Sequence, residues 1–436
     1  MQTYKKYKYS GVEWIGEIPE HWKTLRLRFV CELRNGYTPS KANPDFWSEG
    51  TIPWYRMEDI RESGRRLNEA KQYITESAIK GGGLFEAGSF IMATTATIGE
   101  HAVLIVDSLA NQRFTNLKIR KSLSHSDFNA FFFQYLFVVD DYCKTTTKTA
   151  TFPAVNMEDL KNFIVCIPPL DEQKIILTYL DKKCADIDKV IATQQRRIEL
   201  LQELKQSTIT HAVTRGLNPN VKMKDSGVEW IGEVPEHWNT LRLRFVCELR
   251  NGYTPSKANP DFWSEGTIPW YRMEDIRESG RRLNEAKQYI TESAIKGGGL
   301  FEAGSFIMAT TATIGEHAVL IVDSLANQQF TNLKIRKSLS HSDFNAFFFQ
   351  YLFVVDDYCK TTTKTATFPA VNMEDLKNFI VCIPPLDEQK IILTYLDKRC
   401  AELDNSISKA QKEIDLLQEY KQALITEVVT GKRKVC

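Results

Sequence analysis

Two long stretches of the chain have the spacing of apolar residues that is typical of helices paired along a narrow seam. From Asp171 to about Arg215 the sequence contains neither proline nor glycine, and apolar residues recur at steps of three and four or their sums. The same spacing returns near the C-terminus. The apolar residues of the two seams are Leu180, Cys184, Ile187, Ile191, Ile198, Leu201, Leu396, Cys400, Leu403, Ile407, Ile414, Leu417, Leu424 and Val428. This pattern predicts two helices of roughly 45 residues, each about 65 Å long.

A narrow apolar seam on a helix of this length needs a partner that covers it. We predict that each helix pairs with the other in an antiparallel coiled coil. The alternative is that each helix lies on the globular part of the chain that precedes it.

The stretch from Gly11 to about Ile167 has a different pattern. Short apolar runs such as SFIMATTATI and HAVLIV alternate with turn-forming segments such as NGYTPSK, ANPDFWSEG and KGGGLF, which predicts strands and turns. The best helix in this region is DFNAFFFQYLFVVDDYCK, residues 127–144, and its apolar residues on all sides predict that it is buried. We call this region a module.

Half of the chain is a copy of the other half. Gly11 begins GVEWIGEIPEHW and Gly227 begins GVEWIGEVPEHW, an offset of 227 − 11 = 216 residues. Along that offset Ser10 to Lys182 matches Ser226 to Lys398 except at Ile18/Val234, Lys23/Asn239 and Arg113/Gln329. Beyond the matching region the helices and the linker diverge. The order is therefore module, helix, module, helix.

These patterns predict an α+β fold with two mixed modules, a pair of long antiparallel helices and a pseudo-two-fold internal repeat. We place the first module at 1–167, the first long helix at 168–216, the linker and second module at 217–383, and the second long helix with the tail at 384–436. The polar segment LNPNVKMKD is the predicted linker.

The composition is that of a globular protein, with 43% hydrophobic and 25% charged residues. A formal net charge of +1 gives no bulk basic field, so any contact with nucleic acid has to come from local patches. No stretch of about 18 uninterrupted apolar residues occurs, and the start MQTYKKYKYS lacks an apolar signal region. We therefore expect a cytoplasmic protein without membrane contact.

The order of the segments suggests a class of target. Two equal units in tandem can set their helices antiparallel, which relates the modules by an approximate two-fold axis. Double-stranded DNA has such an axis between its strands, and dimeric DNA-binding proteins use it to read inverted repeats. Here one chain would supply both halves. Recent duplication without selection on function is the alternative explanation for the near-identity of the modules.

The chain resembles the specificity subunits of type I DNA restriction and modification enzymes over nearly its whole length, twice. The matching text in the first copy is SGVEWIGEIPEHW, NGYTPSK, IPWYRMEDI, FEAGSFIMATTATIGEHAVL, NQRFTNLKI and TFPAVNMEDLKNFIVCIPPLDEQKIILTYLD. The most specific element is PPLDEQ ahead of a long helix, at Pro168 to Gln173 and again at Pro384 to Gln389.

The resemblance implies a subunit without catalysis of its own and without a bound cofactor. Its two modules would be target recognition domains, each reading one half of a split DNA site, while the helices set the gap and dock two methyltransferase subunits. A restriction translocase subunit is an optional further partner, and S-adenosylmethionine, ATP and magnesium belong to the partner subunits. The two recognition domains usually differ in this family, whereas here they are nearly identical, which predicts a palindromic target.

Three basic clusters in each module are candidates for DNA contact, because Arg and Lys bind phosphates and guanine edges. One flanks a glycine turn in DIRESGRRLNE, one ends an apolar run in LKIRKSLSH, and one is the acid-free KTTTKTATF. A solvated surface is the alternative for each cluster. The candidates are Arg61, Arg65, Arg66, Lys118, Arg120, Lys121, Lys144, Lys148, Arg277, Arg281, Arg282, Lys334, Arg336, Lys337, Lys360 and Lys364.

Two other features are weaker candidates for DNA contact. Tyr37 and Lys41 lie in NGYTPSK, where a plain turn is the simpler interpretation. Among the three differences between the copies, Arg113 against Gln329 has readout chemistry, since Arg favours guanine and Gln favours adenine. Its place beside the apolar run TNLKI favours a structural role.

Catalytic motifs are weak. The text NPDF at 43–46 resembles the NPPF box of adenine methyltransferases, but its second proline is replaced by Asp45 and no FxGxG motif accompanies it. The phosphate-binding motif GxxxxGK[ST] is absent. Asp45, Glu69 and Lys71 fit a loose nuclease pattern of two metal-binding carboxylates and a lysine. The alternative functions are thus a self-sufficient metal-dependent nuclease or a DNA-binding regulator with duplicated domains.

Overall fold

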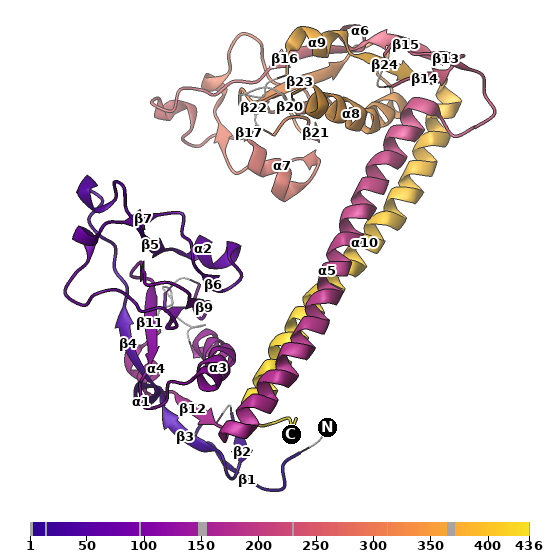
Figure 1. Ribbon diagram of the computed structural model, residues 1–436. Coiled ribbons are helices and arrows are strands. Elements are labelled where there is room, and N and C mark those ends of the chain that lie inside the picture. Colours follow the sequence, from indigo (N-terminus) through magenta and orange to yellow (C-terminus); the bar gives the residue numbers. More distant parts are fainter. Residues whose placement is uncertain are drawn as a thin grey trace. The chain divides into compact units, whose positions relative to one another are not determined.

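The computed structural model describes residues 3–13, 15–95, 97–146, 155–228, 231–311, 313–363 and 371–435 (Figure 1). Its contacts divide the chain into two compact units. Unit 1 consists of Met1–Gln194 with Lys412–Cys436, and unit 2 of Gln195–Gln411. Each unit therefore combines one module with parts of both long helices. The four ranges predicted from the sequence divide the chain by position in the sequence, whereas these units are defined by contacts. The predicted ranges therefore stay a prediction.

The module of unit 1 is built around a five-stranded sheet with the order β4-β11-β8-β9-β6. Its strands are β4 (Cys31–Asn35), β11 (Phe114–Ile119), β8 (Phe90–Ala93), β9 (His101–Leu104) and β6 (Arg66–Leu67). A three-stranded sheet has the order β10-β5-β7, with β10 (Leu109–Ala110), β5 (Ile52–Tyr55) and β7 (Tyr73–Ile74). Two pairs of strands complete it, β1 (Tyr7–Tyr9) with β2 (Glu17–Pro19) and β12 (Ile164–Ile167) with β3 (Lys23–Arg26).

The larger sheet lies between two hydrophobic cores, as the alternation of side chains along β8 shows. Phe90 and Met92 belong to the core that contains helix α3 (Ser126–Thr146), and Ile91 and Ala93 belong to the core that contains the three-stranded sheet. Successive residues of a strand point to opposite faces, so a strand covered on both faces is apolar throughout. Helix α3 is buried as predicted. Phe131 and Tyr135, for example, are fully inaccessible to solvent.

The short helices of unit 1 are α1 (Leu27–Val30), α2 (Met57–Glu62) and α4 (Met157–Asn162), with 3-10 turns η1 (Pro44–Phe46) and η2 (Glu76–Ala78). Unit 2 repeats this module with the same strand orders. Its strands are β13 (Met223–Asp225), β14 (Glu233–Pro235), β15 (Asn239–Arg242), β16 (Cys247–Asn251), β17 (Ile268–Tyr271), β18 (Arg282–Leu283), β19 (Tyr289–Ile290), β20 (Phe306–Ala309), β21 (His317–Leu320), β22 (Leu325–Ala326), β23 (Phe330–Ile335) and β24 (Ile380–Ile383). Its helices are α6 (Leu243–Val246), α7 (Met273–Ser279), α8 (Ser342–Thr363) and α9 (Met373–Asn378), with η3 (Pro260–Phe262) and η4 (Glu292–Ala294).

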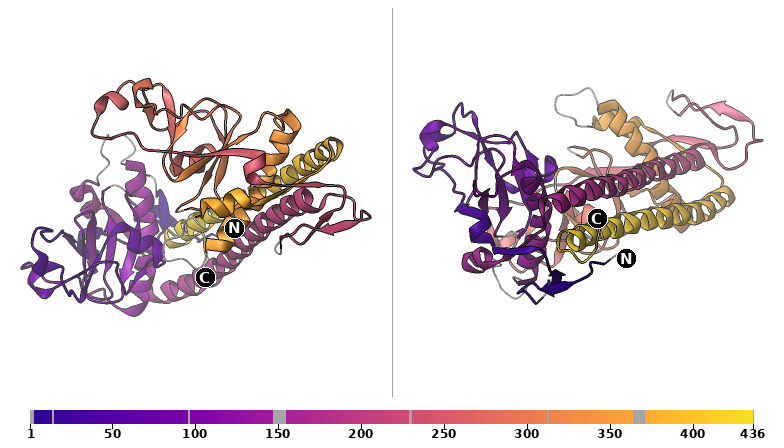
Figure 2. Two further views of the ribbon diagram at one scale, coloured as in Figure 1. Left: turned by 90° about the horizontal axis from the view of Figure 1, so that it is seen from above. Right: turned by 60° about the horizontal axis from the view of Figure 1, so that its bottom comes forward.

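The two long helices are α5 (Leu170–Arg215) and α10 (Leu386–Val429). Within each unit they lie side by side, in both views of Figure 2 as in Figure 1. None of the fourteen residues of the two predicted seams is exposed: Leu424 and Val428 are buried, and Cys184 and Cys400 are half-buried. Leu180, Ile187, Ile198, Leu396, Leu403 and Ile414 are buried, and Ile191, Leu201, Ile407 and Leu417 are half-buried.

Two ion pairs mark which parts of the long helices pair within each unit. In unit 1 the Lys421 ammonium lies 2.6 Å from the Asp188 carboxylate, and in unit 2 the Lys205 ammonium lies 2.7 Å from that of Asp404. Each residue of one pair is the repeat equivalent of a residue of the other, so the contact is reciprocal, as in an isologous interface. In unit 1 the first part of α5 pairs with the last part of α10, and in unit 2 the last part of α5 pairs with the first part of α10, as is expected of antiparallel helices. These exposed pairs contribute about 1 kcal/mol at most and mark the register rather than create it.

Each module also packs on the far end of the helix that begins in the other copy. In unit 1 the core around α3 includes Leu424, Ile425, Val428 and Val429 of α10. In unit 2 the equivalent core includes Ile209, Ala212 and Val213 of α5. The alternative of helices lying on their own modules is thus partly correct, because the first half of each helix also enters the core of the module that precedes it, as Ile176 and Leu180 do in unit 1.

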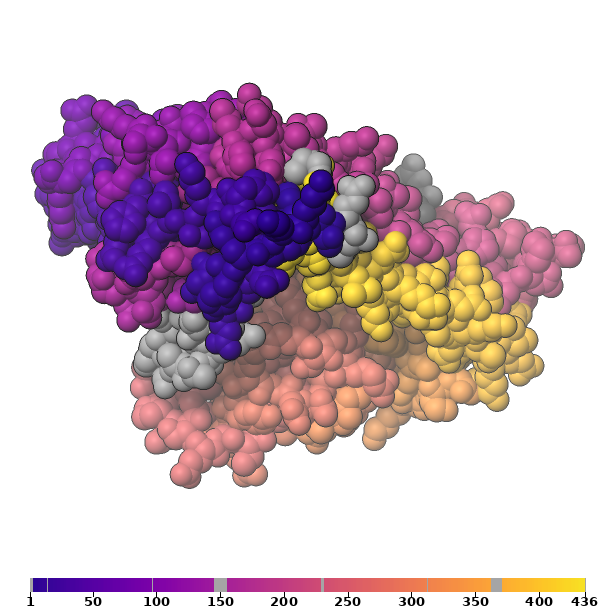
Figure 3. Space-filling view, turned by 90° about the horizontal axis from the view of Figure 1, so that it is seen from below, coloured from indigo at the N-terminus to yellow at the C-terminus, as the bar shows by residue number. Residues whose placement is uncertain are grey.

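The repeated motif EIPEHW holds the start of one helix beside the end of the other. The Trp22 indole donates a hydrogen bond to Glu172 of PPLDEQ at 3.0 Å. The ring of Trp22 also covers Gly431, which follows α10 with φ 74°, and a β-carbon there would lie 2.3 Å from Pro19. Glycine is the usual residue in this left-handed position after a helix. In Figure 3 the indigo N-terminal segment lies against the yellow end of α10.

The carboxylate of Glu172 is the polar centre of this junction. It accepts hydrogen bonds from Trp22, from the hydroxyl of Tyr4 at 3.1 Å and from His21. Burial raises the pKa of Glu172, but the hydrogen bonds from Trp22 and His21 outweigh burial and hold the pKa below its usual value of 4.5. The side chain of Gln173 completes the motif by donating to the Pro168 carbonyl at 2.9 Å.

Replacing Glu172 by Gln is expected to lower the free energy of unfolding of unit 1 by about 1–3 kcal/mol, because hydrogen bonds to a charged acceptor are lost. Since the folded pKa is depressed, the carboxylate stabilises unit 1 above its unfolded pKa, and this contribution is lost as the pH falls through the folded pKa. The variant should therefore lose part of the acid sensitivity of unit 1 below about pH 4.5. Denaturant titrations at several pH values measure both effects. Asp171→Asn removes the same charge from the same helical turn at an exposed position, and an equal effect there would contradict the prediction.

In the part of the chain that the structure describes, no helix combines the length and the apolar character that crossing a membrane requires.

Candidate nucleic-acid interface

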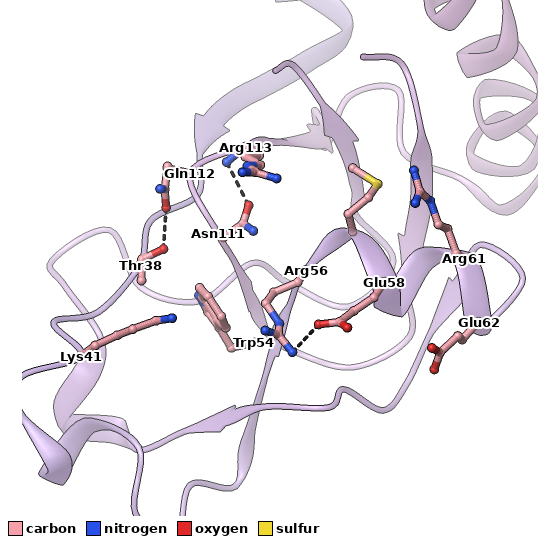
Figure 4. Close-up of a pocket in the computed structure, with 11 residues that line it drawn as sticks. Thr38, Lys41, Trp54, Arg56, Glu58, Arg61, Glu62, Asn111, Gln112 and Arg113 are labelled. Carbon is pink, nitrogen blue, oxygen red and sulfur yellow. Dashed lines mark hydrogen bonds and ion pairs between the residues drawn. The ribbon is translucent and has the colours of Figure 1, made fainter. Parts of the chain in front are cut away.

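The first module carries an open cleft of about 620 Å³ whose lining is rich in side chains that recognise bases and phosphates. Figure 4 shows these residues converging from the end of β5, from helix α2 and from two loops. The lining residues are Thr38, Lys41, Trp54, Arg56, Met57, Glu58, Arg61, Glu62, Asn111, Gln112 and Arg113.

A parallel pair of strands brings two of these segments together. Strands β5 and β10 pair in parallel through Trp54 with Leu109 and Tyr55 with Ala110. Because parallel strands end at the same edge of a sheet, Arg56 after β5 and Asn111 after β10 leave the sheet side by side. The backbone N–H of Asn111 donates to the Tyr55 carbonyl at 3.1 Å, which fixes this arrangement.

The other loop, NGYTPSK, follows β4 and lies close to the Asn111 loop. A β-carbon on Gly36 would lie 2.3 Å from the Asn111 carbonyl oxygen, so only glycine allows this approach. The Tyr37 N–H donates to the Ala110 carbonyl at 2.9 Å, and the Trp54 indole donates to the Tyr37 carbonyl at 3.0 Å. The loop that carries Lys41 is therefore attached to the same edge.

Hydrogen bonds orient several lining side chains, as Figure 4 shows. Thr38 donates to the Gln112 amide oxygen at 2.5 Å, and the side-chain oxygen of Asn111 accepts from the Arg113 backbone N–H at 2.9 Å. Arg56 forms an ion pair with Glu58. The backbone of Arg56 is fixed by the buried Asp59, which accepts from its N–H at 2.6 Å at the start of α2.

The charges in the cleft favour a polyanion that presents base edges. Four cationic side chains, of Lys41, Arg56, Arg61 and Arg113, face two carboxylates, those of Glu58 and Glu62. Arginine can bind guanine, glutamine and asparagine can bind adenine, and a carboxylate can accept from cytosine. Lys41 and Arg113 are exposed, so a duplex could reach them without a change in the fold.

Module 2 has the equivalent residues in equivalent local contacts. Thr254 donates to Gln328 at 2.5 Å, and Arg272 pairs with Glu274. The one lining residue that differs is Gln329, which replaces Arg113. Its amide oxygen accepts from the side chain of Asn327 at 3.0 Å.

The structure brings one of the predicted basic residues in each module to this region, Arg61 and its equivalent Arg277. Arg61 lines the cleft and lies 3.2 Å from Glu100, and Arg277 lies 3.7 Å from Glu316. The other described candidates lie outside the lining. Six of them form ion pairs with carboxylates: Lys118 with Glu86, Arg120 with Glu32, Lys144 with Asp140, and in the second module Lys334 with Glu302, Arg336 with Glu248 and Lys360 with Asp356. Four others are exposed: Arg66, Lys121, Arg282 and Lys337. Lys148 and Lys364 lie outside the described residues. DNA contact by any of these residues stays a prediction.

The geometry favours packing over DNA contact for Arg65 and Arg281. The Arg65 guanidinium lies 4.7 Å from the centre of the Phe137 ring and 3.1 Å from Nε2 of His101. Burial, together with the nearby Arg65, lowers the pKa of His101 to about 3, so this imidazole is neutral and can accept the hydrogen bond. Arg281 makes the same contacts with Phe353 and His317. Both arginines thus pack the glycine turn of DIRESGRRLNE against the core of their module.

Two of the three residues of the loose nuclease pattern, Lys71 and Asp45, make other contacts. The Lys71 ammonium lies 2.5 Å from Glu62 and 3.7 Å from Glu58. The backbone carbonyl of Asp45 accepts from Thr75 in the turn at η1. Within the described ranges, no group of three or more His, Cys, Asp and Glu side chains could hold a metal ion. This arrangement gives the nuclease alternative no support.

Sequence reasoning missed Arg56, Glu58, Asn111 and Gln112, and it gave little weight to Lys41 and Arg113. The available signal was positional. The apolar run IPWY is followed by Arg56, and the apolar run LA is followed by Asn111-Gln112-Arg113. Residues that follow parallel strands lie at the same edge of the sheet. The parallel pairing of two runs so far apart in the sequence is not visible from the residues alone.

Known proteins resemble this chain, some of them over nearly its whole length. The family described as type I restriction modification DNA specificity domain matches residues 19–202 and 235–415. The chain is 42% identical to the type I restriction enzyme EcoprrI specificity subunit of Escherichia coli over 168 residues, 38% of this chain and 42% of that one. It is 24% identical to the type I restriction enzyme MjaIX specificity subunit of Methanocaldococcus jannaschii over 442 residues, 97% and 95% of the two chains.

The fold has a counterpart among solved structures. A chain from a structure concerning complex assembly and conformational transition of the type I R-M system superposes with a TM-score of 0.60 at 18% identity, covering 95% of this chain and 99% of that one. The predicted fold class, two mixed modules with long central helices, is confirmed. Since the family match covers most of both halves, the chain belongs to the type I restriction modification DNA specificity family and carries one specificity domain in each half.

Proposed function

We propose that this chain is the non-catalytic DNA specificity subunit of a type I restriction and modification complex. Each module reads one half of a bipartite site through the cleft between β5, β10 and the NGYTPSK loop. The observation that carries this proposal is the cleft of the first module, which presents arginine, lysine, asparagine and glutamine side chains and whose lining residues all recur in the second module except Arg113. The family assignment is consistent with it.

The reciprocal helix contacts support two half-sites in inverted orientation. Each module receives the same contacts from the end of the long helix of the other copy, including Gln422 to the Phe137 carbonyl in unit 1 and Gln206 to the Phe353 carbonyl in unit 2. Equivalent environments of the two modules are what a two-fold arrangement requires, and such an arrangement would match the symmetry of duplex DNA. The helices would then act as the spacer that sets the gap between half-sites.

We propose that the outer faces of the long helices dock two methyltransferase subunits. Leu200 and Leu204 of α5 are 48% and 44% exposed, and their equivalents Leu416 and Tyr420 of α10 are 64% and 50% exposed. Exposed apolar pairs at equivalent positions of both helices are suited to two copies of one partner. The partners would bring S-adenosylmethionine for methylation, and a restriction translocase subunit would bring ATP and magnesium chemistry.

An assay with the purified full-length chain tests the proposal. The chain alone should bind a specific duplex, should not methylate it with S-adenosylmethionine, and should not cut it with magnesium. Methylation should appear when the methyltransferase subunit is added. Cutting by the chain alone that is abolished by Asp45→Ala with Asp261→Ala would overturn the proposal in favour of a nuclease. Binding without any sequence preference would also overturn it.

A further inference from the structure

The residues that line the cleft of the first module recur in the second module except at one chemically important position. Of the three differences between the copies, Ile18/Val234 is fully buried on both sides and changes the core by one methylene. Lys23/Asn239 is exposed at the start of β3 and β15, outside the residues that line the cleft. Of these positions only Arg113, the equivalent of Gln329, lines the cleft of the first module.

The backbone at this position is the same in both modules. The Arg113 carbonyl accepts from the Thr94 N–H at 2.8 Å, and the Gln329 carbonyl accepts from the Thr310 N–H at 2.9 Å. The N–H groups of both residues donate to the preceding asparagine side chains, at 2.9 Å in module 1 and 3.0 Å in module 2. The difference is therefore confined to the side chain, and each module shows that the fold accepts the residue of the other.

The side chains present different hydrogen-bonding groups to a ligand. Gln329 is half-buried, and its amide oxygen accepts one hydrogen bond from Asn327, which leaves the NH₂ group and the second lone pair of that oxygen for a ligand. Arg113 is exposed and has no acceptor, so it cannot receive the corresponding hydrogen bond from Asn111. Module 1 therefore offers the Arg113 guanidinium and the amide donors of Asn111, whereas module 2 offers the side-chain amides of Asn327 and Gln329, which are hydrogen-bonded to each other.

We infer that position 113 in module 1 and position 329 in module 2 determine one base pair of each half-site, so that the target is palindromic except at that pair. This inference rests on the proposed function. Arg113 would select guanine, whose O6 and N7 accept two hydrogen bonds from a guanidinium. Gln329 would select adenine, whose N6 and N7 suit an amide. Discrimination at each position is expected to be roughly 5- to 100-fold in affinity.

The experiment is a selection of bound duplexes from a randomised library by the full-length chain and three variants. The wild type should enrich two inverted half-sites that differ at one pair, guanine in one and adenine in the other. Arg113→Gln should make both half-sites carry adenine, and Gln329→Arg should make both carry guanine. Lys23→Asn removes the same charge outside the cleft, is also present in the other copy, and should leave the target unchanged.

The outcomes separate this inference from the proposed function. If all variants enrich the same bipartite target, the inference is wrong and the specificity role stands. If Arg113→Gln weakens binding equally to all sequences and reduces the salt dependence, Arg113 contacts phosphate, and the inference is again wrong. If neither the wild type nor any variant enriches a bipartite target, the proposed function fails and the inference fails with it.

Discussion

Val429→Asp is expected to destabilise unit 1 by roughly 2–7 kcal/mol while unit 2 keeps its protection, because it places a polar group in a core without a partner. Val429 is fully inaccessible to solvent and belongs to the core around α3, although it lies 429 − 135 = 294 residues from Tyr135 of the same core. The effect should appear in the first module rather than in the second module, which directly precedes α10 in the sequence.

Hydrogen exchange followed by mass spectrometry measures this effect segment by segment. In Val429→Asp the amides of the five-stranded sheet of unit 1 should exchange faster, and those of unit 2 should exchange at wild-type rates. Val213→Asp, at the equivalent position in α5, should give the reverse pattern. Val190→Asp introduces the same group into α5 at a position 41% exposed and should change neither unit substantially. If hydrogen exchange in Val429→Asp were faster only in unit 2, the end of α10 would not pack in the core of the first module, and the account would be contradicted.

The second large effect concerns DNA binding. Replacing Lys41 and Arg61 together by Glu should weaken binding to the specific duplex by on the order of 100-fold or more, because two cationic contacts become repulsive and one half of a bivalent interaction is lost. Titrations at several salt concentrations should show the slope of log affinity against log salt reduced by about 2, since each phosphate contact contributes about 0.9.

A charge-matched double variant shows whether the loss of DNA affinity comes from the cleft or from the change in the total charge of the protein. Lys23→Glu with Lys183→Glu changes the same number of charges at exposed positions outside the cleft. We expect a loss of less than about 10-fold there, because charges at a distance are screened by salt. Equal losses in the two double variants would show that the cleft is not the contact surface.

The long helices were predictable because their signals are local. Pro169 precedes α5, no proline or glycine follows before Gly216, and apolar residues recur at steps of three and four or their sums along much of the helix. The burial of α3 was predictable for the same reason, since its residues are apolar on every side. The internal repeat was readable directly from the text and gave the order of the segments.

The parts that sequence reasoning missed depend on contacts between distant residues. The apolar seam of α10 predicts a partner but does not reveal that Leu424 and Val428 complete the core of the first module. Arg65 has the composition of a DNA contact, and only the position of Phe137 and His101 beneath it shows its packing role. The convergence of Arg56 and Asn111 requires the parallel pairing of β5 with β10.

The most direct test of the whole account is the target that the wild-type chain selects when it is joined by its methyltransferase subunits. Sequencing of the bound and methylated duplexes should reveal two short half-sites of nearly the same sequence, inverted relative to each other and separated by a gap of constant length. A single continuous target, two half-sites in direct orientation, or a gap that varies freely would contradict the account.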